Sequence, residues 1–430
     1  MKRQVLLLHW LLLLPLLFSI SAVAQFRVVA YLPTWVSPAT AIAQVDLNKL
    51  THLNIAFSNP GDNTGAVLTP ADGLTTAQIT TIVNACHAKN VKVFMSIGGS
   101  TTTTIAGYYQ AILGNAAQQT IFVTTLRDFV SNHHLDGIDV DIEGDVLDGT
   151  HVTDVEYESF VTALADTLHN HGKLVSAALA TWFDNFVTNT AASRFDWVNV
   201  MSYDAYGTWT GPGPHSPYSL ATDDFYTWNV DKAVPASQLN IGMPFYGYGW
   251  GSYVTTDEMA YCDIVNTYTG AENTDSVGSS ASGNMISYNG LPTIIQKTKY
   301  ALAHAGGVMI WQITEDCASS DHRSLLRAID SLVHPLTVTA IYNHPSSLQQ
   351  LNVFPNPTSG QVQVQLNLPS ASNGSLTLCD LNGVALQELL SGTLDAQGQY
   401  NLQLSGYHSG LYLLKLVTDN GIQVQKISKQ

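Results

Sequence analysis

Regularly spaced acidic residues are the part of this sequence best suited to chemistry. They stand at Asp136, Asp139, Asp141 and Glu143, and apolar residues alternate with the last three. Side chains of a β-strand alternate between its two faces, so these last three acids are expected to point in one direction. Burying several carboxylates together is unfavourable because like charges repel, and the pKa of at least one of them rises. A carboxyl group that keeps its proton at neutral pH is what general acid catalysis needs.

Alternating acids on one strand have other interpretations. Ca²⁺ and Mg²⁺ prefer carboxylate oxygens, so the row also suits a metal site, and a satisfied polar core is a further alternative. Glu143 comes last and has the longest side chain, which suits it to be the general acid. Asp141 stands one strand period earlier and is placed to modulate it. Taken alone, the strand favours catalysis over metal binding.

The surrounding segments alternate between strand and helix patterns. Apolar residues at helical spacing predict helices in residues 75–89, 118–133, 153–171, 291–304 and 320–333. Short β-branched runs predict strands at residues 26–31, 52–57, 91–97, 137–143, 174–179, 197–203, 239–245 and 307–311. Eight such strands over about 310 residues predict an α/β fold, a (β/α)8 TIM barrel, with an open doubly wound sheet as the alternative.

The acids and several aromatic residues fall at the same end of these strands. Glu143 ends the fourth strand, and TIM-barrel active sites are built at the carboxyl ends. Aromatic residues expected to bind a substrate there are Tyr31, Phe57, Trp182, Tyr203, Tyr246 and Trp311. Trp35 and Trp209, in nearby loops, are weaker candidates. Packing in the core is the competing role for each ring taken singly.

Four stretches together resemble glycoside hydrolase family 18, the chitinases. Residues 136–143 match the D-x-x-D-x-D-x-E signature of that family. Ser-Ile-Gly-Gly at 96–99, Met-Ser-Tyr-Asp at 201–204 and Gly-Val-Met-Ile-Trp at 307–311 agree with its other motifs, in the same order. The run at 242–247 is also similar to the end of the family's seventh strand. The resemblance covers about residues 26 to 333.

The resemblance implies retaining hydrolysis of β-1,4-linked N-acetylglucosamine polymers, assisted by the substrate itself. Glu143 would protonate the glycosidic oxygen, and the acetamido carbonyl of the sugar would be the nucleophile. Asp141 would hold the acetamido N–H, and Asp139 would share a proton with Asp141. Tyr203 would orient the acetamido group, and Trp311 would form the floor of the pocket. No metal or other cofactor is then expected.

Further residues complete the site that this resemblance implies. Asp204 would bind the sugar or position its acetamido group, and Met201 belongs to the same substrate-binding set. Supporting roles are expected for Asp136, Ser96, Gly98 and Gly99. Asp136 would cap or orient the acidic strand, and the two glycines would permit close backbone packing.

Two alternatives to a chitinase remain open at this point. An endo-β-N-acetylglucosaminidase that acts on N-glycans would share every motif. A lectin-like relative would bind chitin without cutting it, but such relatives usually lack the terminal acid, and Glu143 is present. Only about 60 residues separate the seventh and eighth strands. A full α+β insertion is therefore not expected there, and the cleft is predicted to be shallow and open.

The two ends of the chain indicate export. Residues 1–24 are expected to be a signal peptide, because Lys2 and Arg3 precede an apolar run that ends in a small-residue cleavage site. A membrane anchor is the disfavoured alternative, since the apolar run is short. The catalytic barrel is expected at 25–336, a linker at 337–351 and a small all-β sandwich at 352–430, where turn signals separate short β-type runs.

The start and end of this tail resemble the C-terminal sorting domains of the type IX secretion system. The resemblance rests on Phe-Pro-Asn-Pro-Thr-Ser-Gly at 354–360 and on the segment 410–416. It implies the outer-membrane secretion machinery as a partner and a secreted or cell-surface location. A carbohydrate-binding module is the alternative, but no tryptophan follows Trp311.

Charge and cysteines exclude several other functions. The chain has 33 acidic and 17 basic residues, a net charge of −16, which gives no electrostatic footprint for nucleic acid. We expect a monomer whose glycan partner is chitin or another N-acetylglucosamine polymer. None of Cys86, Cys262, Cys317 and Cys379 stands in C-x-x-C spacing, which disfavours structural zinc. Export permits disulfides, but the sequence leaves their pairing open.

Overall fold

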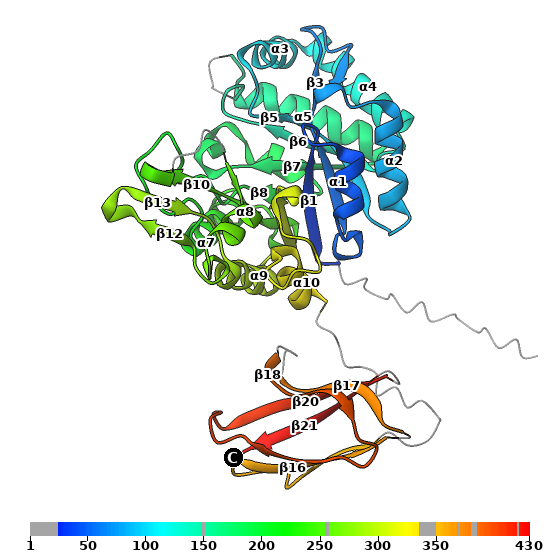
Figure 1. Cartoon of the computed structure of the whole chain (residues 1–430). Helices are drawn as coiled ribbons and strands as arrows, with labels where there is room; N and C mark the ends of the chain where they lie inside the picture. The colour runs from blue at the N-terminus through cyan, green and yellow to red at the C-terminus, as the bar shows by residue number, and fades with distance from the viewer. Residues whose placement is uncertain are drawn as a thin grey trace, which may run out of the picture. The chain divides into compact units, whose positions relative to one another are not determined.

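The chain folds as two compact units (Figure 1). The computed structural model describes residues 25–147, 151–253, 258–334, 350–368, 370–379, 385–418 and 421–430. The expected signal peptide, and residues 337–349 of the expected linker, lie outside the described residues. Each unit has its own hydrophobic core and is described separately below.

Eight parallel strands close into a barrel in the N-terminal unit. Their order around the ring is β1-β14-β9-β8-β7-β6-β5-β2. They are β1 (Arg27–Pro33), β2 (His52–Ala56), β5 (Lys92–Gly99), β6 (Gly137–Ile142), β7 (Leu174–Leu179), β8 (Trp197–Val200), β9 (Leu239–Pro244) and β14 (Gly307–Trp311). Each expected strand is present, and the closed ring confirms the TIM barrel over the open sheet.

Helices surround the barrel (Figure 1). They are α1 (Pro38–Gln44), α2 (Thr76–His87), α3 (Thr103–Leu113), α4 (Ala116–Asn132), α5 (Asp154–His169), α6 (Asn189–Arg194), α7 (Tyr218–Tyr226), α9 (Leu291–His304) and α10 (Leu325–Val333). Capping boxes define where two of them begin, Thr75 with Gln78 at α2 and Thr153 with Glu156 at α5. Within the described residues, no helix is long and apolar enough to cross a membrane.

A compact α+β element lies between β9 and β14, where we expected no full insertion. It contains β10 (Tyr246–Trp250), β11 (Met259–Ala260), α8 (Tyr261–Thr267), β12 (Ser276–Ser279) and β13 (Asn284–Ser287). The four strands form an antiparallel sheet in the order β11-β10-β13-β12. Tyr203 and Trp311 pack against the aromatic side chains of β10. The element therefore supports one side of the barrel mouth. The prediction of a shallow, open cleft assumed that no such element was present.

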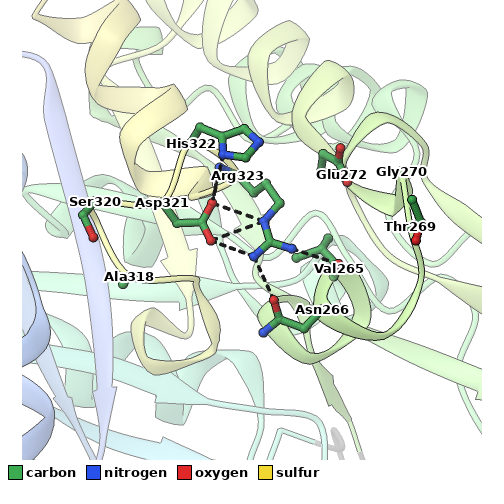
Figure 2. Close-up of a pocket in the computed structure, with 10 residues that line it drawn as sticks. All are labelled: Val265, Asn266, Thr269, Gly270, Glu272, Ala318, Ser320, Asp321, His322 and Arg323. Carbon is green, nitrogen blue, oxygen red and sulfur yellow. Dashed lines mark hydrogen bonds and ion pairs between the residues drawn. The ribbon is translucent and has the colours of Figure 1, made fainter.

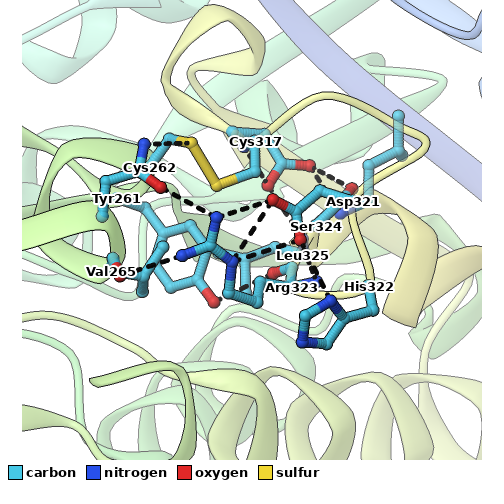
Figure 3. Close-up of a disulfide and its surroundings, with 12 residues drawn as sticks. Tyr261, Cys262, Val265, Cys317, Asp321, His322, Arg323, Ser324 and Leu325 are labelled. Carbon is cyan, nitrogen blue, oxygen red and sulfur yellow. Dashed lines mark hydrogen bonds and ion pairs between the residues drawn. A yellow bond between two sulfur atoms is a disulfide. The ribbon is translucent and has the colours of Figure 1, made fainter. Parts of the chain in front are cut away.

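A disulfide between Cys262 and Cys317 connects this element to the barrel (Figure 3). Cys262 belongs to α8, and Cys317 follows β14, so the bond joins the insertion to the segment after the last barrel strand. Arg323 adds a polar connection, because it donates to the Val265 carbonyl at 3.0 Å. The disulfide answers the pairing question that the sequence left open. The other two cysteines are buried and free.

The C-terminal unit consists of two antiparallel sheets, in the orders β15-β16-β19 and β18-β17-β20-β21. The strands are β15 (Gln350–Phe354), β16 (Gln361–Asn367), β17 (Ser372–Cys379), β18 (Ala385–Leu394), β19 (Gln399–Gln403), β20 (Gly410–Thr418) and β21 (Gly421–Lys429). Leucine and valine side chains from both sheets share one core, as expected for a sandwich. Two strands were missed from the sequence, β15 and β18. The first begins at Gln350, inside the expected linker.

Candidate active site

Strand β6 carries the acidic row into the interior of the barrel. Asp139 contacts side chains from β1, β5, β7 and β8, which places it inside the ring. The intervening apolar residues Ile138, Val140 and Ile142 are fully buried. The alternation expected from the sequence is therefore present. Glu143 follows the last residue of the strand and is only partly buried, so it stands at the mouth of the barrel.

Asp139 is the most completely bonded acid of the row. Its Oδ2 accepts from the Tyr31 hydroxyl at 2.7 Å and from Ser96 Oγ at 2.8 Å. Its Oδ1 accepts from Ser176 Oγ at 2.6 Å and from Asn199 Nδ2 at 3.3 Å. Burial raises the pKa of Asp139, and these donors oppose the rise. The carboxyl group is therefore held from four strands.

Asp141 differs from Asp139 in having no donor for one of its buried oxygens. In the described part of the chain, its Oδ1 has no hydrogen-bond partner and no hydrogen bond joins it to Asp139. The proton sharing implied by the family resemblance thus stays a prediction. Burial first, and then the charges of Glu143 and Asp139, raise the pKa of Asp141 well above its ordinary value.

The backbone beside Asp141 explains why Gly98 is required. Gly98 has a φ of 107°, in the region that favours glycine, and a Cβ there would lie 2.2 Å from the Asp141 carbonyl oxygen. At Gly99 a Cβ would lie 2.5 Å from the ring of Phe57. Both glycines allow close packing, as the sequence predicted.

Glu143 has a pKa well above that of an ordinary glutamate. Burial raises it to about 7, with further contributions from the charges of Asp145 and Asp204. Its backbone carbonyl accepts from the N–H groups of Val146 and Leu147, which turns the chain immediately after the acid. A substantial fraction of Glu143 therefore carries a proton near neutral pH.

Several residues that support the acids were missed from the sequence. Ser176 and Asn199 stand on expected strands and point at Asp139, and their signal was a polar side chain within a buried apolar run. Asp145 was missed too, although it follows Glu143 by two residues. Its carboxylate accepts from the backbone N–H of Thr101 at 3.1 Å and from the hydroxyl of that residue.

Tyr203 and Asp204 follow the end of β8 and lie at the same mouth. Among the described residues, the Tyr203 hydroxyl donates only to the Met309 sulfur, 3.9 Å away, which is a weak acceptor. Burial raises the pKa of Tyr203, so its hydroxyl keeps its proton and can donate. Asp204 has a φ of 63° and accepts from the Tyr246 hydroxyl at 2.5 Å. Met201 packs against the apolar cluster beneath them.

The aromatic residues divide into supporting and exposed groups, which corrects three predictions. Tyr31 and Tyr246 are each 1% exposed and bond to carboxylates, so neither presents a ring face to a sugar. Phe57 is also buried, and it stacks on Trp311 with ring centroids 5.8 Å apart. These rings instead support the acids and Trp311. Trp311 itself is partly buried and lies 6.2 Å from the exposed ring of Trp35.

Three tryptophans outside the barrel strands have exposed rings. Trp182 is 67% exposed and lies against Gly144, the residue after the acid, where a Cβ would be 2.5 Å from its ring. Trp35 and Trp209, which we considered weaker candidates, are exposed as well. Exposed aromatic faces beside the acid are suited to stacking on a sugar.

Asp136 lies at the opposite end of β6 from Glu143. Its Oδ2 accepts from the Val93 N–H at 2.8 Å and bonds to His87 Nε2 at 2.8 Å. These contacts orient the start of the strand, in line with the supporting role that we predicted. They do not bring its side chain to the mouth of the barrel.

A surface pocket of about 720 Å³ lies beside the disulfide, and no acid of the row lines it (Figure 2). Its guanidinium group, Arg323, is already bonded to Asp321, the Val265 carbonyl and Asn266. The pocket therefore offers no free charged donor. Among the described residues, no group of three or more His, Cys, Asp or Glu side chains is arranged to hold a metal ion.

The fold and the carboxyl groups define a TIM-barrel protein with a row of buried acids that leads to the barrel mouth. The chain belongs to glycoside hydrolase family 18, because the family model described as glycosyl hydrolases family 18 matches residues 27–316. Residues 352–430 match a secretion system C-terminal sorting domain. The protein is therefore a secreted or cell-surface member of the family, which confirms the expected location.

Similar proteins agree with this assignment. A solved structure described as the GH18 chitinase ChiB of Flavobacterium johnsoniae is 32% identical, with a TM-score of 0.63, and the match covers 73% of this chain and 95% of that one. Chitinase A1 of Niallia circulans is 24% identical, over 69% of this chain and 57% of the relative. A class V chitinase of Arabidopsis thaliana is 25% identical, over 67% and 86%. The chain spans 57% of the length of Chitinase A1, and also 57% of the length of a chitinase-like effector of Moniliophthora perniciosa.

Proposed function

We propose that this protein is a retaining glycosidase that hydrolyses β-1,4-N-acetylglucosamine linkages in chitin or chitin oligosaccharides. The observation that carries the proposal is the position of Glu143. It ends the acidic strand at the barrel mouth with a pKa of about 7. The sorting domain makes the outer-membrane secretion machinery a second partner.

In this proposal Glu143 donates its proton to the glycosidic oxygen as the bond to the leaving sugar breaks. An acid catalyst works best when its pKa lies near the operating pH, and burial brings Glu143 there. The charge of Glu143 in turn raises the pKa of Asp141, because two adjacent buried carboxyl groups cannot both ionise at low cost. The pair therefore keeps at least one proton at neutral pH.

The acetamido oxygen of the substrate attacks the anomeric carbon as the glycosidic bond breaks, as in the substrate-assisted scheme of this family. Water then opens the oxazolinium ion that results, and Glu143 takes back a proton from that water. The sugar needs two contacts for the attack, one at its acetamido N–H and one at its carbonyl oxygen. Asp141 has an unpartnered Oδ1 for the first contact. Tyr203 has a protonated hydroxyl with only a sulfur acceptor for the second. Asp204, which follows β8, contacts the acetamido group as well. Asp139 holds strand β6 in place deeper in the barrel.

The first experiment compares the mature protein with Glu143→Gln on chitin oligosaccharides and on a high-mannose glycopeptide. Glutamine has nearly the same shape but no acidic proton, so we expect kcat to fall by about three orders of magnitude. Products are identified by mass spectrometry. Glu272→Gln is the matched control, because this residue lines the surface pocket of Figure 2 and not the barrel mouth.

Each outcome separates the proposal from its alternatives. Cleavage of chitin oligosaccharides by wild type and by Glu272→Gln, but not by Glu143→Gln, supports the proposal. Cleavage of the glycopeptide alone would keep the mechanism and assign the protein to endo-β-N-acetylglucosaminidases. A folded wild-type protein that binds chitin and cuts neither substrate would be a lectin. A melting temperature that falls with chelator would instead indicate a structural calcium site.

A further inference from the structure

His215 is a fully buried histidine beside the proposed site, in the segment between β8 and α7. Its backbone carbonyl accepts from the Ala205 N–H at 2.9 Å, and its own N–H donates to Ser287 Oγ at 3.0 Å. These bonds hold it between the turn that carries Asp204 and strand β13 of the insertion. The histidine therefore lies behind Asp204, on the side away from solvent.

The imidazole ring faces the carboxylate of Asp204. His215 Nδ1 lies 3.8 Å from Asp204 Oδ1, the same oxygen that accepts from the Tyr246 hydroxyl. The rings of Tyr246 and Tyr248 enclose the imidazole, with centroids 5.2 and 5.5 Å away. Within the described part of the chain, neither ring nitrogen has a partner at hydrogen-bond distance, although Asp204 and the Tyr246 backbone lie close enough to act on the ring and the side chain is completely buried. Unpartnered buried polar groups are costly and call for a functional explanation.

The charges around the ring favour its neutral form. Burial is the largest effect on His215 and lowers its pKa, and the charge of Lys297 on α9 lowers it further. Asp204 acts in the opposite direction. The remaining titratable groups that face the ring, Tyr246 and Tyr248, keep their protons because burial raises their pKa values. A neutral imidazole has one N–H to donate.

The backbone conformation of Asp204 explains why its carboxylate needs hydrogen-bond donors on the buried side. Its φ of 63° is uncommon for a residue other than glycine, so the surrounding structure must hold this conformation. The Tyr246 hydroxyl supplies one donor, and the distance to His215 leaves room for a second. Hydrogen bonds of catalytic groups are often long without substrate and shorten when it binds.

We propose that His215 is a positioning residue for the hydrolysis proposed above, and that its Nδ1–H holds the Asp204 carboxylate from the buried side when substrate engages it. This inference rests on the proposed function, because Asp204 is the group through which His215 acts. It assigns a role to a side chain that has no direct path to the sugar.

Three variants separate this role from packing. His215→Asn keeps a donor near the place of Nδ1, whereas His215→Phe fills the same space without one. The control is His52→Phe. His52 is also a buried histidine, but it is the first residue of β2, and its ring centroid lies 4.6 Å from that of Trp197. All three are compared with wild type by melting temperature, kcat and KM on a chitin oligosaccharide.

We expect His215→Phe to lower kcat about tenfold, with KM changed less than about threefold, because a misplaced positioning group slows the chemical step. His215→Asn should restore kcat to within about threefold of wild type, and His52→Phe should leave it unchanged. Equal losses of kcat in the asparagine and phenylalanine variants, or a His215→Phe enzyme with wild-type kcat, would overturn the proposal.

A second measurement does not depend on turnover. Nitrogen-15 NMR of the imidazoles, assigned with His215→Asn, should show the proton of His215 on Nδ1 and its loss from that atom in Asp204→Ala, which removes the acceptor. A proton on Nε2 in wild type would overturn the proposal. If wild type fails to cleave any oligosaccharide, the proposed function fails while the NMR result still decides whether His215 holds Asp204.

Discussion

Two carboxyl groups on one strand, Asp139 and Asp141, have opposite environments although they are only two residues apart. Asp139 accepts four hydrogen bonds from four strands. Within the described residues, Asp141 has a buried oxygen with no partner, and burial and its acidic neighbours raise its pKa well above the ordinary value. The first is suited to hold the strand in place, and the second is free to bind a substrate.

The register of the neighbouring strands explains the difference. Asp139 stands opposite Ser96 of β5 and Ser176 of β7, and both donate to it. Asp141 stands opposite Gly98, which has no side chain to donate. A shift of two residues along the strand thus exchanges serine for glycine. Active sites commonly combine such a satisfied support with an unsatisfied reactive group.

Of the two aspartates compared, the larger effect on catalysis is expected from Asp141→Asn, which tests the reactive carboxyl group. An amide cannot accept a proton or stabilise positive charge as a carboxylate does, so kcat should fall about 100- to 1000-fold. The melting temperature should not fall, because no donor loses a partner at Oδ1. Steady-state kinetics measures the expected fall in kcat, and thermal melting measures the expected unchanged melting temperature. A large loss of stability would show that Asp141 is structural.

Asp139→Ala tests the supporting half and should act mainly on stability. It leaves the Tyr31, Ser96, Ser176 and Asn199 donors without their shared acceptor in the core. Unsatisfied buried donors are costly, so we expect unfolding to become easier by about 3 kcal/mol. Urea denaturation of the mature protein measures this change. An unchanged midpoint would mean that water or a rearranged side chain replaces the carboxylate.

The sequence predicted the barrel and the acidic row because both depend on local pattern. Eight apolar runs marked the eight strands, and period-two alternation placed Asp139 and Asp141 inside the ring. The donors of Asp139 could not be predicted in the same way. Tyr31 and Asn199 come from strands far apart in the chain, and only the closed ring brings them together.

The aromatic residues show a second limit of prediction from sequence. A tyrosine at a strand end has an apolar ring and a polar hydroxyl, so it suits a sugar site and a buried hydrogen bond equally. The structure uses the hydroxyls of Tyr31 and Tyr246 for carboxylates, while Trp182, in a short 3-10 helix after β7, is exposed. The compact insertion was likewise underestimated, because its strands are short and rich in glycine and serine.

Trp182→Ala should have a smaller effect, because it removes an exposed ring and no reacting group. Loss of one stacking surface is worth about 1 kcal/mol, so we expect KM to rise about fivefold with little change in kcat. The matched control is Tyr226→Ala, another exposed aromatic residue, at the end of α7. Equal effects of both substitutions on KM would exclude a specific role for Trp182.

The smallest expected effect is a shift of the pH profile in Asp145→Asn. Glu143 must be protonated to act, so kcat/KM should fall as the pH rises through its pKa of about 7. The charge of Asp145 raises that pKa, so its removal should move the fall to lower pH, by about half a unit. Asparagine can still accept from Thr101, which keeps the local structure.

The control is Asp128→Asn, which makes the same charge change on an exposed residue of α4 and should leave the pH profile unchanged. If both variants shift the profile equally, the net charge of the protein and not Asp145 sets the acidity of Glu143.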